Sequence, residues 1–74
     1  MNTYSQDRHL PIHINEKPLS VPGDSTLLSV LRTLRHADGK HVSVALNGVF
    51  VRSADWASQN ICTDDQLMVI EAAN

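Results

Sequence analysis

The sequence predicts an α+β fold in which one helix packs on a mixed sheet of four or five strands. Alternating apolar and polar residues, typical of half-buried strands, occur near both ends of the chain and in its middle. Between them, leucines recur at helical spacing. A chain of 74 residues has room for one domain with a modest core, which favours a carrier or a binding module over an enzyme.

The N-terminal part predicts a β-hairpin. Apolar side chains alternate along its first strand: Leu10, Ile12 and Ile14. Pro11 argues for an edge position or a strand that starts one residue later, and residues 19–21 return after a turn at residues 15–18. Because residues 1–8 have no such period, we expect a mobile N-terminal arm followed by one domain over residues 9–74.

The next segment predicts a single amphipathic helix. Its apolar stripe is formed by Leu27, Leu28, Val30, Leu31 and Leu34. Asp24 or Ser25 is expected to cap the N-terminus, because a side-chain oxygen there can accept from free amides of the first turn. Arg32 and Arg35 come late, where cations suit the helix dipole, and Asp38-Gly39 is expected to end the helix.

The second half of the chain predicts another hairpin. Asn47-Gly48 between two apolar runs is a strong hairpin signal, since both turn residues need positive φ. This turn places Leu46 opposite Val49. One face then carries Val42, Val44, Leu46, Val49 and Val51, and the other Ser43, Ala45, Phe50 and Arg52. The following segment is too short for a packed helix, so Trp56 is expected to plug a single turn against the sheet.

Residues 67–71 form the last predicted strand, after a plain turn at Asp64-Asp65. The predicted order is therefore two strands, a helix, two strands, a connecting turn and a strand. One amphipathic helix across such a sheet is the β-grasp (ubiquitin-like) architecture, a two-layer fold. Helical bundles and sandwiches fit the pattern less well.

The strand pattern also predicts an exposed apolar face. Leu67 and Val69 are expected in the core, which turns the alternate residues of the last strand outward. If this strand neighbours the second hairpin, one patch is formed by Ala45, Phe50, Met68 and Ile70. Such patches usually mark a partner surface. A register shift of one residue would instead bury these side chains.

Composition excludes several classes of function. The net charge is −2 with no basic stripe, which argues against nucleic acid as a partner. No segment approaches the roughly 20 apolar residues that cross a membrane, and the polar N-terminus does not resemble a signal peptide. The single cysteine cannot form an internal disulfide. We therefore expect a cytoplasmic protein with no membrane or nucleic-acid partner.

Few side chains suggest catalytic or metal chemistry. Cys62 could be a persulfide or thioester site, but beside Ile61 a small buried hydrophobe is the favoured interpretation. One cysteine also excludes the cluster of a plant-type ferredoxin, which needs four. No metal site is expected at the four histidines, which lack cysteine or carboxylate partners at ligand spacing: His9, His13, His36 and His41.

The second half has the order of a known family. The stretch VSVALNGVFVRSADW (42–56) is a strand, an Asn-Gly turn, a second strand and a tryptophan. Together with INEKPLSVP in the first hairpin and the ending at 61–73, it resembles the sulfur carriers of thiamine biosynthesis (ThiS-type, in the ThiS/MoaD ubiquitin-like family). The resemblance covers about Leu10 to Asn74, and its motifs are individually weak but agree in order and spacing.

The resemblance implies a carrier that is not an enzyme and that needs no cofactor. In such carriers the C-terminal glycine carboxylate is adenylated by an E1-like adenylyltransferase (ThiF-type) and converted to a thiocarboxylate. The sulfur then passes to a thiazole synthase (ThiG-type). Glycine suits a tail that enters a narrow active site, because it lacks Cβ.

The sequence departs from this pattern at its end. The family pattern continues to Gly-Gly, whereas the sequence stops at Asn74. The junction between body and tail is therefore expected at Ala72, Ala73 and Asn74, and we expect the native chain to continue to Gly-Gly. A molybdopterin-synthase small-subunit-type carrier and a tail-less β-grasp interaction module stay open as alternatives. A nucleotide- or RNA-associated domain is disfavoured by the acidic balance.

Overall fold

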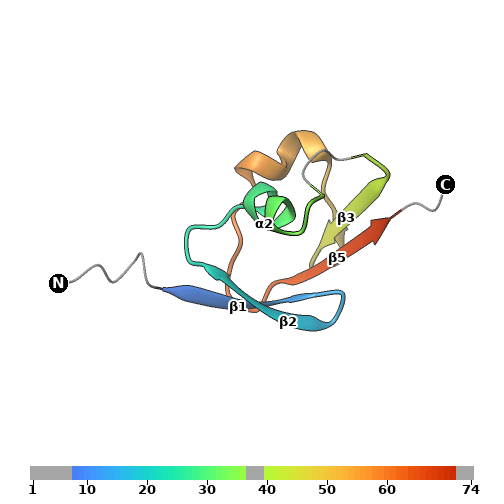
Figure 1. Ribbon diagram of the computed structural model, residues 1–74. Coiled ribbons are helices and arrows are strands. Elements are labelled where there is room, and N and C mark those ends of the chain that lie inside the picture. The colour runs from blue at the N-terminus through green and yellow to red at the C-terminus, as the bar shows by residue number, and fades with distance from the viewer. Residues whose placement is uncertain (1–7, 37–39, 72–74) are drawn as a thin grey trace.

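The computed structural model describes residues 8–36 and 40–71, which form a five-stranded sheet with two helical segments on one side of it (Figure 1). In chain order the elements are β1 (His9–Ile14), β2 (Lys17–Pro22), α2 (Leu27–Thr33), β3 (Val42–Leu46), β4 (Val49–Phe50), the 3₁₀ helix η1 (Ser53–Ser58) and β5 (Gln66–Glu71). The predicted order of elements is confirmed. Most of the expected arm, Asp38-Gly39 and the expected tail junction lie outside the described residues.

The last strand lies in the middle of the sheet. The strand order is β2-β1-β5-β3-β4. β5 runs parallel to β1 and antiparallel to β3, so the sheet is mixed, as predicted. Both alternatives suggested by Pro11, an edge position and a later start of the strand, are wrong, since β1 lies between β2 and β5 and already begins at His9. Proline is tolerated there because the pairing with β5 begins only at His13.

The helix begins one residue later than a cap at Ser25 would place it, and two residues later than a cap at Asp24. Thr26 is the N-cap: its side chain accepts from the Ser29 amide at 3.2 Å, and the Ser29 hydroxyl accepts from the Thr26 amide at 3.0 Å. This reciprocal pair is a capping box. The expected cap at Asp24 or Ser25 is wrong, because a bridge between Thr26 and Asn60 keeps Thr26 extended.

The helix also ends before the predicted Asp38-Gly39. Leu34 is the C-cap, and Arg35 has φ 67°. The Arg35 amide donates to Arg32 O at 3.0 Å and the His36 amide to Leu31 O at 2.8 Å, which is the hydrogen-bond pattern of a Schellman motif. Arginine therefore takes the left-handed position that glycine usually fills.

The capping box gives a first testable expectation. Replacing Thr26 by alanine removes the acceptor of the Ser29 amide, and we expect the free energy of unfolding to fall by about 1 kcal/mol. Asp24→Ala, at the cap expected from the sequence, should change it by less than about 0.5 kcal/mol. Urea denaturation followed by circular dichroism measures both variants, and equal losses would contradict the assignment of the cap.

The core lies between the sheet and the two helical segments. It contains Ile12, Val21, Leu27, Val30, Leu31, Val44, Leu46, Trp56, Ile61, Leu67 and Val69. The expected role of Trp56 as a plug is confirmed: its side chain is 2% exposed, and its indole Nε1–H donates to Val51 O at 3.0 Å. A buried indole needs such a partner.

One residue on the helix-facing side of the second hairpin is exposed. Val49 pairs with Leu46, as expected, and therefore points to the same side of the sheet as that buried residue. Its side chain is nevertheless 65% exposed. The predicted pairing is confirmed, and Val49 is exposed because β4 is a two-residue edge strand directly after the turn, at the margin of the core.

Candidate functional site

The outer face of the sheet brings together the four side chains expected to bind partners. Ala45 pairs with Phe50 across β3 and β4 and with Met68 across β3 and β5. Ile70 lies two residues beyond Met68 on β5, on the same face. We call Ala45, Phe50, Met68 and Ile70 the outer patch.

The outer patch faces away from both helical segments. Buried and exposed residues alternate along β5, with Leu67 and Val69 in the core. Phe50 is 63%, Ile70 57% and Met68 45% exposed. The predicted orientation of these strands is confirmed. The patch therefore presents large apolar side chains on the strand that leads towards the C-terminus.

Hydrogen bonds around Asn47 fix the register that creates this patch. The Asn47 Oδ1 accepts from the Gln66 amide at 2.9 Å, and its Nδ2 donates to Asp65 Oδ1 at 3.0 Å. The other carboxylate oxygen of Asp65 accepts from the Cys62 amide at 2.8 Å. The predicted turn is present, but its central residues are Thr63 and Asp64. The Asp65 amide closes it by donating to Cys62 O at 3.2 Å. The Asp65 side chain is buried and accepts hydrogen bonds. These contacts join the β3–β4 turn to the start of β5 and oppose a shift of register.

The other candidate side chains are dispersed. Cys62 is exposed, so the favoured burial of its side chain is wrong: Ile61 takes the core position beside it. Two histidines lie on β1, His36 follows α2, and His41 precedes β3. Within residues 8–36 and 40–71, no three His, Cys, Asp or Glu side chains gather closely enough to hold a metal ion. No helix in that part of the chain is long and apolar enough to span a membrane.

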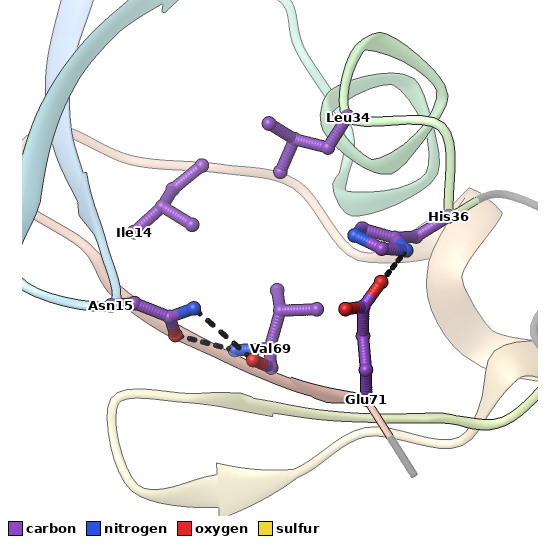
Figure 2. Close-up of a pocket in the computed structure, with 6 residues that line it drawn as sticks. All are labelled: Ile14, Asn15, Leu34, His36, Val69 and Glu71. Atoms are coloured by element: carbon purple, nitrogen blue, oxygen red, sulfur yellow. Dashed lines mark hydrogen bonds and ion pairs between the residues drawn. The ribbon is translucent and has the colours of Figure 1, made fainter. Parts of the chain in front are cut away.

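A pocket lies on the helix side of the sheet where β5 ends (Figure 2). It encloses about 230 Å³ and is lined by Ile14, Asn15, Leu34, His36, Val69 and Glu71. The Asn15 side chain bonds to the backbone of Val69, and His36 Nδ1 lies 3.5 Å from Glu71 Oε2. The sequence did not predict these contacts, because the residues around Asn15 indicated only a turn.

The described chain stops at Glu71, one residue before the expected tail junction. Ala72, Ala73 and Asn74 lie outside the described residues. The structure places the two residues before that junction: Ile70 belongs to the outer patch, and Glu71 lines the pocket on the opposite side of the sheet. The end of β5 therefore has an apolar surface on one side and polar contacts on the other.

One helix packed on a mixed five-stranded sheet, with the last strand inserted next to the first, defines a β-grasp protein. The model of the ThiS family matches residues 6–73. The chain belongs to the ThiS family.

The fold resembles a solved structure. It is similar to the crystal structure of the thiamine biosynthesis protein (ThiS) from Geobacter metallireducens, with a TM-score of 0.75 and 19% sequence identity. The match covers 88% of this chain and 97% of that one. None of the curated proteins matches the chain. At 19% identity the structural match supports the β-grasp fold, while the family rests on the match over residues 6–73.

Proposed function

We propose that the chain is a sulfur carrier in thiamine (thiazole) biosynthesis and acts as a substrate rather than as an enzyme. The observation that carries this proposal is an outer patch across β3, β4 and β5, the last of which leads towards the C-terminus, in a chain that belongs to the ThiS family. A carrier needs a body that docks to a partner and a tail that reaches into the partner's active site. The described residues supply the body.

The proposed chemistry takes place at the C-terminal carboxylate. A carboxylate oxygen attacks the α-phosphorus of ATP, so that an acyl-adenylate forms and pyrophosphate leaves. A sulfur nucleophile then attacks the acyl carbon and AMP leaves. With hydrosulfide the product is the thiocarboxylate itself. With a persulfide donor the product is an acyl disulfide, from which a thiol releases the thiocarboxylate by forming a disulfide with the donor. An E1-like adenylyltransferase (ThiF-type) would catalyse adenylation, and a thiazole synthase (ThiG-type) would take the sulfur.

The outer patch suits two successive partners. Phe50 offers a rigid aromatic surface of the kind enriched at interfaces. Met68 is unbranched and adapts its shape to different neighbours. Both partners must reach the same C-terminus, so we propose that each docks on this patch in turn.

The test is thiocarboxylate formation on the full native chain. The protein is incubated with an E1-like adenylyltransferase, ATP and a sulfur source, and its intact mass is measured. We expect the mass to rise by the difference between sulfur and oxygen, and to stay unchanged when ATP is omitted. Absence of the shift, while a known carrier is converted by the same enzyme, would exclude the carrier function and favour an interaction module.

A second arm separates the two kinds of carrier. The thiocarboxylate product is offered either to a thiazole synthase or to a molybdopterin-synthase large subunit. We expect only the thiazole synthase to return the carrier to its original mass. Consumption by the molybdopterin enzyme alone would retain the carrier function but overturn its assignment to thiamine biosynthesis.

A further inference from the structure

The last strand extends further than its parallel neighbour. β1 ends at Ile14, and its pairing with β5 is limited to His13 with Gln66 and Ile14 with Leu67. The chain then turns away at Asn15, which has φ 50°. On the β1 side, β1 itself therefore provides no strand residue opposite Val69.

The side chain of Asn15 fills this position. Its Oδ1 accepts from the Val69 amide at 2.8 Å, and its Nδ2 donates to Val69 O at 3.1 Å (Figure 2). A carboxamide carries the same donor and acceptor groups as a peptide bond, so Asn15 continues the β1–β5 pairing with its side chain. The backbone amide of Asn15 adds a bond to Leu67 O at 2.8 Å.

Asn15 restrains the end of β5 on the side where β1 has already ended. On the other side β3 pairs with β5 as far as Val42 with Glu71. The contact between His36 and Glu71 contributes less, because Glu71 is 69% exposed and exposed ion pairs are worth little. The two part-buried bonds of Asn15 are therefore the main restraint on this edge of Val69.

We propose that Asn15 is a positioning residue for the carrier reaction: it fixes the direction in which the chain leaves β5. This inference rests on the proposed sulfur-carrier function. When a partner binds the outer patch, the C-terminal carboxylate reaches the partner's active site in the right position only if the end of β5 is held rigidly. Displacements of about 1 Å at a reacting group can lower a rate about a hundredfold.

Asn15 does not belong to the outer patch, which allows docking and tail placement to be measured separately. Its side chain lines the pocket on the helix side of the sheet. Asn15 also borders a hollow shared with Glu16, Ala45 and Met68, so Glu16→Gly controls for any effect of this turn on docking. Loss of the Asn15 side chain should therefore lower the turnover of the adenylation step and leave the affinity for the adenylating enzyme unchanged.

The test uses Asn15→Gly in the full native chain, because glycine keeps the positive φ of the turn without strain. Glu16→Gly is the matched control, since Glu16 follows in the same turn with φ 73°. We expect Asn15→Gly to lower the kcat of ATP-dependent adenylation about tenfold and to change KM less than about twofold. Glu16→Gly should change neither constant by more than about twofold.

Amide hydrogen exchange tests the contact itself. In Asn15→Gly the Val69 amide should exchange about tenfold faster relative to the amides of Met68 and Ile70. Those two amides point towards β3 and serve as internal references. Asn15→Asp keeps one acceptor for the Val69 amide and loses the donor to Val69 O, so its kcat should be intermediate.

The outcomes distinguish this inference from the proposed function. If the wild-type chain is adenylated and Asn15→Gly has an unchanged kcat, or raises KM alone, Asn15 is not a positioning residue and the carrier function stands. If the wild-type chain is not adenylated, the carrier function fails and the positioning role fails with it. Unaltered exchange at Val69 would show that the Asn15 contact does not hold β5.

Discussion

Replacing Trp56 by alanine is expected to lower the free energy of unfolding by about 3–5 kcal/mol. The indole is 2% exposed and lies in the core on η1, so its loss leaves a cavity and an unpaired Val51 carbonyl. A domain of this length has a total stability of roughly 4–11 kcal/mol, so the variant should be marginally folded. Because Trp56 is the only tryptophan, the measurement is urea denaturation followed by far-UV circular dichroism.

Trp56→Phe separates packing from hydrogen bonding. It keeps an aromatic ring in the core and removes the Nε1–H that donates to Val51 O, so we expect a loss of about 1–3 kcal/mol. If Trp56→Ala lowers the free energy of unfolding by less than about 1 kcal/mol, the packing of η1 on the core contributes little to stability. Losses of equal size in the two variants would mean that the hydrogen bond, and not the packing, sets the stability.

The sequence predicted those features that depend on local pattern. Alternation along residues 42–46 and 67–71, and the spacing of the leucines in α2, are set by which face of each element is buried. The turn at Asn47-Gly48 has φ 51° and 85°, as its residue types require. The outer patch could be predicted because it depends only on this alternation and on one strand neighbour.

The features that were missed depend on contacts between distant parts of the chain. The helix is capped by Thr26 because Asn60 bridges to it, and the side-chain carboxamide of Asn15 bonds to the backbone of Val69, 54 residues away. Threonine and asparagine are also common in ordinary caps and turns, so the residue types of Thr26 and Asn15 alone did not reveal these roles. The exposure of Val49 has a related cause, since alternation gives the face of a residue but not how far the core extends.

The exposure of Val49 provides a control for the partner surface. Val49 is 65% and Phe50 63% exposed, and the two are neighbours in β4. Their side chains point to opposite faces of the sheet: Phe50 belongs to the outer patch, while Val49 pairs with Leu46. A charge introduced at either position has almost the same access to water, so a difference in binding reports the face that the partner uses.

Phe50→Asp is expected to weaken binding of the E1-like adenylyltransferase about thirtyfold, which is the effect of losing an aromatic hot spot of about 2 kcal/mol. Val49→Asp should weaken it less than about threefold. Both substitutions are at exposed positions, so each should change the free energy of unfolding by less than about 1 kcal/mol. Calorimetric titration gives the affinities, and urea denaturation gives the stabilities.

The pair of variants decides between a docking face and a structural one. If Phe50→Asp unfolds the domain, Phe50 contributes to packing and the patch is not a free surface. If both variants bind as well as the wild type, the partner docks elsewhere on the body. Weakening by Val49→Asp alone would place the partner on the helix side, next to the edge of β4. Only selective loss in Phe50→Asp matches a carrier that presents its C-terminal strand through the outer patch, because Met68 and Ile70 continue that surface along β5.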